Sequence, residues 1–371
     1  MTTKINNEHK KVYAPNLRFP EFQGEWEKSK LSDLCTFFSG GTPSSSNKDF
    51  YGEDIAFIRS GELHADSTEL FITQDGYDNS SAKMVEIGDL LLAMYGATSG
   101  DIAISKIKGA INQAILCIRT NQNKKFIESV WNKHVSKILR KYLQGGQGNL
   151  SADIVKGISF SFPTLEEQER IANLISLLDE RIATQNKIID KLQSLIKGIG
   201  KQLFMDNQNW RTVKIGELLR IGNGKDYKHL SIGKIPVYGT GGQMLLVNDY
   251  LYDGESVCIG RKGTIDTPMF LKGKFWTVDT LFYTYDFKDV LPKFCYYLFL
   301  QINWKLYNEG TGVPSLSKST IENIKVKIPS LEQQQKICSI LDCYEHKTNN
   351  EEQILELYHS EKQYLLRQMF I

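Results

Sequence analysis

The sequence predicts a mixed α/β protein in which two α+β domains alternate with two long helices. Three observations predict this fold: a decamer that occurs twice, a heptad-like apolar pattern after each copy, and strand-like runs between Gly-rich turns before each copy. The decamers are FPTLEEQERI, from Phe162, and IPSLEQQQKI, from Ile328, and they lie 166 positions apart. A chain of 371 residues is also longer than one ordinary domain. We therefore expect a tandem of two units, each a globular domain followed by a helix.

The repeat extends beyond the decamer and sets the predicted boundaries. At the same offset, the segment around Leu150 aligns with that around Leu316. A second match, WEKSKLSDL from Trp26 and WRTVKIGEL from Trp210, has an offset of 184, so the second unit is 18 residues shorter between its anchors. The predicted parts are an N-terminal segment (1–25), a first domain (26–162), a central helix (163–206), a second domain (207–328) and a C-terminal helix (329–371).

Each decamer carries the start signal of a helix. Thr164 and Ser330 are residue types that favour the N-cap position, and each follows a proline. Glu167 and Gln333 lie three residues further on, which completes the pattern of a capping box. Both helices are therefore expected to begin at the decamers.

The helices carry an apolar seam. In the first helix the 3–4 spacing runs from Ile182 to Leu203, with Gln185 as its one polar member. In the second helix the equivalents of Ile182 and Gln185 are Thr348 and Glu351, and the apolar pattern resumes afterwards. The residues that we expect to pack helix on helix are Ile171, Leu178, Ile182, Ile189, Leu192, Ile196, Ile337, Leu341, Leu355, Tyr358 and Leu365.

The order of the parts predicts how the two helices pair. Each helix has about 40 residues, which corresponds to a rod of roughly 60 Å at ~1.5 Å per residue. Neither rod can bury its seam alone, so the simplest solution is that they pack on each other. Because each domain precedes its helix, an antiparallel pair would place the two domains at opposite ends, related by a pseudo-two-fold axis. The alternative is a general coiled-coil dimerisation element.

The composition excludes several classes of protein. Hydrophobic residues make up 41% of the chain and charged residues 24%, as in proteins with ordinary cores. The polar N-terminus does not resemble a signal peptide, and no run approaches the ~20 apolar residues that span a bilayer. The six cysteines form no C-x-x-C pair, and the six histidines have no metal-ligand spacing. We expect a cytoplasmic protein with reduced thiols, no metal site and no membrane partner.

The two domain sequences carry a family resemblance. GDLLLAMYGATSG and GAINQAILCI in the first domain, and IPVYGTGGQ, GRKGTID and FWTVDTLFYTY in the second, are each followed by a segment rich in Gly, Ser and Leu and by a P-[ST]-L-E-x-Q helix start. This ordered set, present twice, resembles the two target recognition domains and spacer helices of a type I restriction–modification specificity subunit. The resemblance covers nearly the whole chain, from about Leu17 onward.

The resemblance implies both an architecture and a role. Two target recognition domains would be separated by two long antiparallel coiled-coil helices, and each domain would read one half of a bipartite, asymmetric double-stranded DNA target. The helices would fix the unread spacer and dock two methylation subunits, and restriction subunits would join the full complex. S-adenosylmethionine would bind in the methylation subunits, and ATP and Mg²⁺ in the restriction subunits. The chain itself would be a non-catalytic subunit of a DNA adenine methyltransferase and endonuclease, without a cofactor of its own.

Missing motifs agree with a chain that has no catalytic residues. No two prolines are adjacent, so the N/D-P-P-aromatic motif of amino-methyltransferases is absent, and no G-x-x-x-x-G-K-[ST] phosphate loop occurs. Net charge is uneven along the chain. Residues 1–163 contain 19 basic and 18 acidic side chains, whereas residues 205–329 contain 16 and 12. This excess is small for a protein that binds DNA alone, so partner subunits are expected to supply part of the phosphate contact.

The candidate DNA contacts are polar residues in Gly-rich loops, because exposed donors and acceptors read base edges and backbone N–H groups and cations bind phosphates. In the first domain they are Thr42, Ser44, Arg59, Ser60, Tyr95, Thr98, Asn112 and Gln113. In the second domain they are Lys225, Tyr227, Lys228, Tyr238, Thr240, Arg261, Lys262, Thr264, Trp276, Thr277 and Asp279. For each residue, a role in a turn or at a strand end is the competing interpretation. Asn112 and Gln113 are candidates for capping roles, and Trp276 for a place in the core.

Two functions of other classes remain open at this stage. One is a stand-alone DNA-binding regulator with two recognition domains, which would bind its site tightly without partners. The other is a coiled-coil adaptor that does not bind DNA, which steep salt-dependent retention on DNA would exclude.

Overall fold

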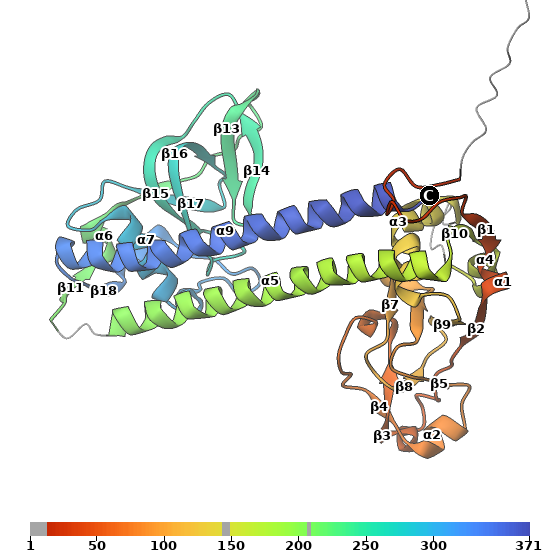
Figure 1. The fold of residues 1–371 in the computed structure, drawn as a ribbon. Coiled ribbons are helices and arrows are strands. Elements are labelled where there is room, and N and C mark those ends of the chain that lie inside the picture. The colour runs from red at the N-terminus through yellow and green to blue at the C-terminus, as the bar shows by residue number, and fades with distance from the viewer. Residues whose placement is uncertain (1–12, 143–148, 206–208) are drawn as a thin grey trace, which may run out of the picture. The chain divides into compact units, whose positions relative to one another are not determined.

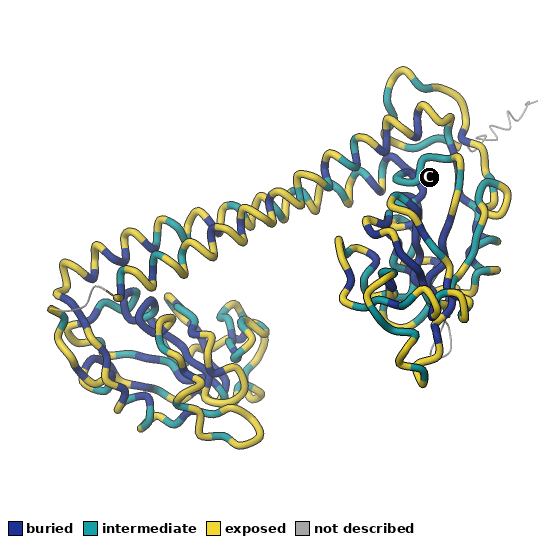
Figure 2. Tube along the Cα trace, turned by 90° about the horizontal axis from the view of Figure 1, so that it is seen from below, coloured by how far each residue is buried: buried dark blue, intermediate teal, exposed yellow. Residues whose placement is uncertain are grey.

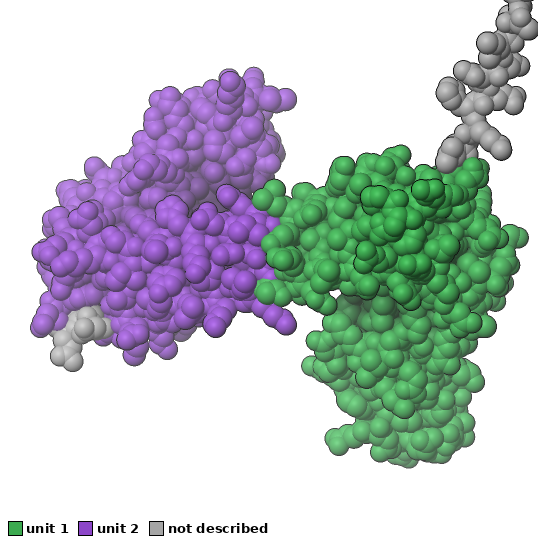
Figure 3. Space-filling view, in the orientation of Figure 1, with its two compact units in different colours: residues 1–184, 355–371 green, residues 185–354 purple. Residues whose placement is uncertain are grey.

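The computed structural model describes residues 13–142, 149–205 and 209–371. It contains two compact units, shown in Figure 3: unit 1 comprises Met1–Thr184 with Leu355–Ile371, and unit 2 comprises Gln185–Ile354. The predicted N-terminal segment is described only from Tyr13, because residues 1–12 lie outside the described range. The end of the predicted central helix, residue 206, lies outside it as well.

Unit 1 contains two four-stranded sheets and one two-stranded sheet. Their strand orders are β2-β9-β6-β7, β4-β3-β8-β5 and β1-β10. The pairs are antiparallel except for β3 and β8, which run parallel. The strands are β1 (Glu27–Lys30), β2 (Cys35–Ser39), β3 (Tyr51–Ile58), β4 (Phe71–Ile72), β5 (Lys83–Val85), β6 (Leu90–Ala93), β7 (Ile102–Ile104), β8 (Gly109–Ile111), β9 (Ile115–Thr120) and β10 (Ser159–Phe162). The helices of the domain are α1 (Leu31–Leu34), α2 (Gln74–Asp78), α3 (Lys124–Tyr142) and α4 (Ala152–Gly157), with 3₁₀ turns η1 (Lys48–Phe50), η2 (Ser60–Glu62) and η3 (Gly96–Thr98).

Unit 2 contains a six-stranded sheet, in the order β12-β17-β15-β16-β13-β14, and a two-stranded sheet of β11 and β18. Here β13 and β16 are the parallel pair. The strands are β11 (Arg211–Lys214), β12 (Arg220–Asn223), β13 (Ile232–Gly239), β14 (Gly242–Val247), β15 (Tyr252–Gly260), β16 (Met269–Thr277), β17 (Leu281–Tyr285) and β18 (Lys325–Ile328). The helices of the domain are α6 (Ile215–Leu218), α7 (Pro292–Gln301) and α8 (Lys318–Asn323), with the 3₁₀ turn η4 (Trp304–Tyr307).

Two long helices, α5 (Leu165–Met205) and α9 (Leu331–Met369), pass through both units (Figure 1). In unit 1, Lys362 of α9 lies 2.5 Å from Asp179 of α5. In unit 2, the Gln185 amide of α5 donates to the Glu351 carboxylate of α9 at 2.6 Å. Contacts advance along α5 as they recede along α9, so the predicted antiparallel pairing is confirmed.

The predicted seam residues are buried or half-buried along α5 and α9. Figure 2 shows buried positions recurring along α5, among residues that are mostly exposed. The buried members are Ile171, Leu178, Ile189, Leu192, Ile337 and Leu341. The half-buried members are Ile182, Ile196, Leu355, Tyr358 and Leu365. The polar Gln185 and Thr348 are also buried, as expected for positions on a shared seam.

The ends of the helices belong to the domain cores. In unit 1, Ile171 and Ile175 from the start of α5 join Met369 and Phe370 from the end of α9 in one apolar cluster with Phe126 of α3. The C-terminal residue is also held, because the Ile371 carbonyl lies 2.8 Å from Nε2 of His134, and Lys133 donates to the Phe370 carbonyl. In unit 2 the start of α9 and the end of α5 enter the domain core in the same manner.

The repeated decamer has a structural function that explains its repetition. Gln168, which is fully buried, accepts a hydrogen bond from the Asn123 N–H just before α3 and donates to the Pro163 carbonyl. Gln334 accepts from the Leu291 N–H just before α7 and donates to the Pro329 carbonyl. Each decamer therefore fastens the start of a long helix to the start of its domain's own helix.

The predicted capping boxes are formed in part. The Thr164 hydroxyl accepts from the Glu167 N–H, and the Ser330 hydroxyl accepts from the Gln333 N–H, both at 3.4 Å. The Glu167 carboxylate, however, is engaged by the Arg18 guanidinium at 2.7 and 2.8 Å and by the Trp26 indole at 3.3 Å. This buried acid fastens the N-terminal segment to α5, a contact between residues about 150 positions apart that the capping pattern did not predict.

Candidate nucleic-acid interface

In unit 1, four loops open at one edge of the sheets. The end of β2 lies beside the start of β9, since Ser39 pairs with Leu116. The end of β6 lies there as well, because Ala93 pairs with Ile115. The parallel strands β3 and β8 end together at the pair Ile58 and Ile111, and the chain enters β9 a few residues after β8. The loops that follow β2, β3, β6 and β8 therefore meet at one place, which we call the strand-end edge of unit 1.

Unit 2 repeats this arrangement. The end of β12 lies beside the start of β17, since Asn223 pairs with Phe282, and the end of β15 lies there too, since Gly260 pairs with Leu281. The parallel strands β13 and β16 end together at Tyr238 and Thr277. The loops after β12, β13, β15 and β16 therefore form the strand-end edge of unit 2.

Backbone hydrogen bonds show that the two edges are equivalent in detail. The Met94 N–H donates to the Ala114 carbonyl at 2.8 Å, and the Arg261 N–H donates to the Thr280 carbonyl at 2.8 Å. The Met94 carbonyl in turn accepts from the Leu150 N–H at 2.9 Å, and the Arg261 carbonyl accepts from the Leu316 N–H at 2.9 Å. Unit 2 thus carries Arg261 and Lys262 where unit 1 carries Met94 and Tyr95.

The candidate residues of the first domain all lie in the loops of the unit 1 edge. One contact joins two of these loops directly: the Thr42 hydroxyl donates to Oε1 of Gln113 at 2.6 Å. The Asn112 amide oxygen accepts from the Ala114 N–H at 3.0 Å, so this side chain caps its own turn. The residues Thr42, Ser44, Arg59 and Gln113 are exposed, and Ser60, Tyr95, Thr98 and Asn112 are half-buried.

Arg59 is the basic residue of this edge, and its charge is already paired. Its guanidinium donates to Glu62 at 2.7 and 3.2 Å, and its backbone N–H donates to the same carboxylate at 3.0 Å. The hydrogen bond from Arg59 is the main cause that holds the pKa of Glu62 below its ordinary value. Because the Arg59 side chain is 53% exposed, the pair is a surface contact that bound DNA could rearrange at a modest cost.

In unit 2 the loop after β15 carries two adjacent cations, Arg261 and Lys262. Arg261, Lys262 and Thr264 are exposed, and the turn between them depends on Gly263, whose φ of +88° is a conformation that L side chains rarely adopt. A Cβ built on Gly263 would lie 3.9 Å from the Thr240 hydroxyl oxygen, so the turn after β13 lies next to this loop. Lys225, Lys228 and Asp279 are exposed in the neighbouring loops, while Tyr227, Tyr238 and Thr240 are half-buried.

Burial argues against two of the predicted contacts. Thr277 is 0% exposed, and the sheet pairs its backbone with Tyr238. Trp276 is 5% exposed, and its indole N–H donates to the Lys225 carbonyl at 2.8 Å. This buried side chain therefore holds the loop after β12 in place. Successive side chains of a strand point to opposite faces, so the burial of both residues shows that β16 is covered on both faces here.

One segment of the edge was not among the candidates. Residues 309–316 lie against the Arg261 loop, because Lys262 forms a β-bridge with Ser315 and the Gly263 N–H donates to the Pro314 carbonyl at 2.9 Å. Its Val313 is exposed. The glycines of GTGVPS are the sequence signal that could have placed this segment at the interface.

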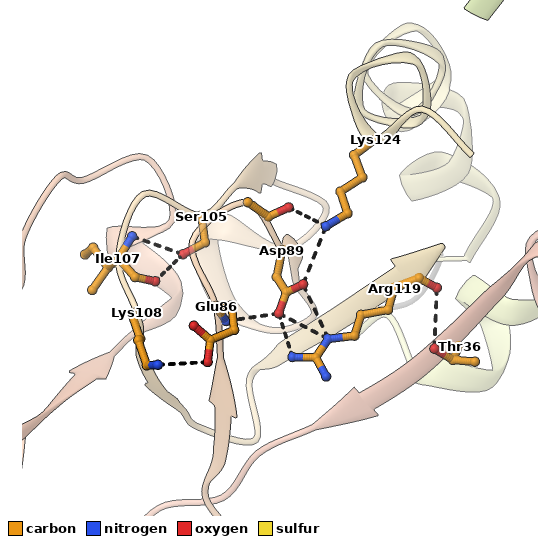
Figure 4. A network of polar contacts seen from close by, with 9 residues as sticks. Thr36, Glu86, Asp89, Ser105, Ile107, Lys108, Arg119 and Lys124 are labelled. Atoms are coloured by element: carbon orange, nitrogen blue, oxygen red, sulfur yellow. Dashed lines mark hydrogen bonds and ion pairs between the residues drawn. The ribbon is translucent and has the colours of Figure 1, made fainter. Parts of the chain in front are cut away.

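A second polar cluster in unit 1 lies at the opposite end of the sheet, where β6 begins and β9 ends (Figure 4). Asp89, which is 5% exposed, accepts from Arg119 at 2.8 Å and from the Glu86 N–H at 3.0 Å, and Lys124 lies 3.6 Å away. Burial acts to raise the pKa of Asp89, but the hydrogen bonds and the two cations together hold it below its ordinary value. These cations neutralise a buried acid, so we do not count them as DNA contacts.

Within the described ranges, no group of three or more His, Cys, Asp or Glu residues is arranged to hold a metal ion. The helices described here include none that is both long enough and apolar enough to cross a bilayer. Among the described residues, the candidate functional sites that we carry forward are the two strand-end edges.

Comparison with known proteins gives a consistent result. The family model of the type I restriction modification DNA specificity domain matches twice, over residues 23–194 and 207–357. Among curated proteins, the putative type I restriction enzyme MjaX specificity subunit of Methanocaldococcus jannaschii is 26% identical, with 90% of this chain and 91% of that protein covered. The MjaVIII specificity subunit of the same organism is 24% identical, with 91% of this chain and 90% of that protein covered.

Solved structures share the fold. The S subunit of a type I restriction–modification system from M. genitalium superposes with a TM-score of 0.65 at 17% identity, over 96% of this chain and 99% of that one. A chain from another type I system superposes with a TM-score of 0.58 at 15% identity, over 92% of this chain and 96% of that one. At these identities the likeness concerns the fold alone.

Proposed function

This chain belongs to the type I restriction–modification DNA specificity family, and we propose that it is the DNA sequence-recognition subunit of a type I restriction–modification complex. In this proposal the edge of unit 1 reads one half of a bipartite, asymmetric target and the edge of unit 2 reads the other. The chain contributes no catalytic residue.

The observation that carries the proposal is the pair of strand-end edges. Both have the same backbone hydrogen bonds, at Met94 in unit 1 and at Arg261 in unit 2, but they present different side chains. A protein that recognises two unlike half-targets needs the same backbone arrangement twice with different side chains on it. Base edges are distinguished by the donors and acceptors that contact them. An edge built of loops can also change its contacts without disturbing the sheets that support it.

The long helices have two roles in the proposal. They keep the unread spacer between the half-targets constant, and they dock two methylation subunits, to which restriction subunits are added in the full complex. S-adenosylmethionine would be bound by the methylation subunits, and ATP and Mg²⁺ by the restriction subunits. Placement of the assembly in the cytoplasm follows from its DNA substrate.

The proposal is tested by exchanging the first recognition domain. Residues 26–162 are replaced by the first domain of a relative with a different known target, and the hybrid is expressed with its methylation subunits. Sequencing of modified bases should show one half-target changed, the other half unchanged and the spacer length kept, because unit 2 and the helices are unaltered.

Change in both half-targets would contradict the assignment of one reader to each unit, and change in the spacer would contradict the role of the helices. Tight, sequence-specific binding by the chain alone, with no gain on adding methylation subunits, would instead favour a stand-alone regulator.

A further inference from the structure

We infer that the two strand-end edges divide the work of DNA binding. Unit 2 supplies most of the salt-dependent attraction to phosphates, and unit 1 binds its half-target chiefly through uncharged groups. This inference rests on the proposed function and adds to it the kind of DNA contact that each edge makes.

The loops differ in charge although their backbones correspond. In unit 1 the strand-end loops, residues 40–47, 59–66, 94–101 and 112–114, contain one basic and three acidic residues. In unit 2 the loops 224–231, 239–241, 261–268 and 278–280 contain four basic and three acidic residues, and the segment 309–316 adds one more acidic residue, Glu309. The larger segments differ in the same direction, since residues 205–329 have an excess of four basic side chains and residues 1–163 an excess of one.

The two edges also differ in how many of their cations are already paired. In unit 1 the Arg59 guanidinium is paired with Glu62, the exposed Asp66 is paired with Lys106 at 2.7 Å, and the half-buried Asp101 forms a hydrogen bond with His64 at 2.9 Å. In unit 2, the described structure records no ion pair for the four cations. They are Lys225, Lys228, Arg261 and Lys262, and all four are exposed.

One acidic residue of the unit 2 loops is neutralised by an ion pair with a lysine outside these loops. Asp266 pairs with Lys305 at 3.0 Å, and this contact holds the pKa of Asp266 below its ordinary value. The remaining acids, Asp226 and Asp279, are exposed beside the lysines. With Glu309 of the segment 309–316, the unit 2 edge therefore offers four cations to the phosphates, and three acidic residues without a recorded ion pair lie among them.

The uncharged groups of the unit 1 edge are suited to a different task. Thr42 and Gln113 are already joined by a hydrogen bond of 2.6 Å, which fixes the direction of the Gln113 amide. An oriented amide can read adenine through two hydrogen bonds, and such contacts release no counterions. Unpaired cations do release counterions when they meet phosphates, and they also speed the first encounter at low salt.

The test is the salt dependence of binding by the assembled complex. The chain with its methylation subunits is titrated against a labelled duplex containing its mapped target, from about 50 to 300 mM salt. The logarithm of the binding constant falls with that of salt concentration by roughly 0.9 per phosphate contact. We expect glutamine at all four unit 2 cations to reduce this slope by about 2 or more; the variant is Lys225→Gln, Lys228→Gln, Arg261→Gln and Lys262→Gln.

Two control variants carry comparable charge changes elsewhere. The first neutralises the unit 1 edge and its flanks, with Arg59→Gln, Lys48→Gln and Lys83→Gln. The second neutralises exposed cations of unit 2 that lie away from its edge, with Lys214→Gln, Arg220→Gln, Lys288→Gln and Lys325→Gln. We expect each to change the slope by less than about 1. The triple variant Lys225→Gln, Lys228→Gln and Lys262→Gln keeps the contact of the Arg261 guanidinium with the Phe282 ring. If its slope also falls, the loss comes from the missing charges and not from unfolding of the loop.

A slope loss in the unit 2 edge variant that exceeds the unit 1 loss by about one contact or more supports the inference, and any smaller difference overturns it. The proposed function fails separately. It is contradicted if the unaltered complex binds the mapped target no better than a duplex of scrambled sequence, whatever the slopes are.

Discussion

The two units share a backbone arrangement and differ in the side chains that it carries. Gln168 and Gln334 make corresponding hydrogen bonds, and the strand-end loops are tied by corresponding backbone contacts. Yet the edge of unit 1 presents hydroxyl and amide groups, whereas that of unit 2 presents cations. The contrast indicates that the contacts that fasten a domain to its helix tolerate little change, while the loops at the strand ends are free to vary.

The interiors differ as well. The Asp89–Arg119 pair joins β6 to β9 in unit 1. At the corresponding place in unit 2, the Ser256 hydroxyl accepts from the Thr284 N–H and the Thr284 hydroxyl accepts from the Val257 N–H, both at 2.9 Å. The same pair of strands is therefore joined by an ion pair in unit 1 and by two hydrogen bonds to hydroxyl groups in unit 2. Three predictions test how far the equivalence of the units extends.

The largest effect is expected at the shared glutamines. Gln168→Leu and Gln334→Leu would each leave a buried N–H and carbonyl groups unpaired, which we expect to destabilise the affected unit by about 3 kcal/mol. Hydrogen exchange at the start of α3 and of α7 measures the loss in each unit separately. The exposed Gln335→Leu is the control and should cost less than about 0.5 kcal/mol. If the two losses differ by more than about 1.5 kcal/mol, the decamers do not have equivalent functions.

A smaller effect, confined to one unit, is expected at Asp89. Asp89→Asn removes charge-assisted hydrogen bonds and should destabilise unit 1 by about 2 kcal/mol, whereas Ser256→Ala should cost unit 2 about 1 kcal/mol. The pKa of Asp89 is lowered by folding, so its contribution is present above the unfolded pKa of about 4 and is lost as pH falls through the folded value. The gap between the unaltered protein and Asp89→Asn should therefore narrow steadily as pH falls below about 4, and a gap that does not narrow there would refute this assignment.

The smallest effect is expected at one of the two positions where the decamers differ in charge, Glu167 and Gln333. Glu167 is buried against Arg18 and Trp26, while Gln333, at the matching position, is exposed. Glu167→Gln should destabilise unit 1 by about 1 kcal/mol, because neutral hydrogen bonds replace charged ones. Gln333→Glu should change unit 2 by less than about 0.5 kcal/mol, as is usual for surface substitutions. Equal costs in a denaturation monitored by hydrogen exchange would show that the Arg18 contact adds nothing.

Local and periodic features of the chain were predictable from its sequence. The duplicated decamer predicted both long helices, which begin at Leu165 and Leu331, and the heptad spacing predicted their buried positions. The antiparallel pairing followed from the order of domain and helix. These predictions succeeded because capping and seam formation depend on residues within a few turns of one another.

Contacts between distant segments were beyond such reasoning. Arg18 with Glu167, and Asp89 with Arg119, join residues that only the folded sheet and helix bring together. The burial of Thr277 depends on the layers that cover both faces of β16, and the sequence of β13 gave no sign of its parallel pairing with that strand. The loops of the edge could be named from their glycines, but the residues that each loop exposes are set by the register of the sheets.

The discontinuity of unit 1 has a consequence for biosynthesis. Unit 2 is a single stretch of chain, so it can fold as soon as it has left the ribosome. Unit 1 must wait for Met369 and Phe370, which pack against Phe126 in its core although translation separates them by more than two hundred codons. The domain that is translated first is thus completed only by residues near the end of the sequence, and until they arrive part of its apolar core lacks its partners.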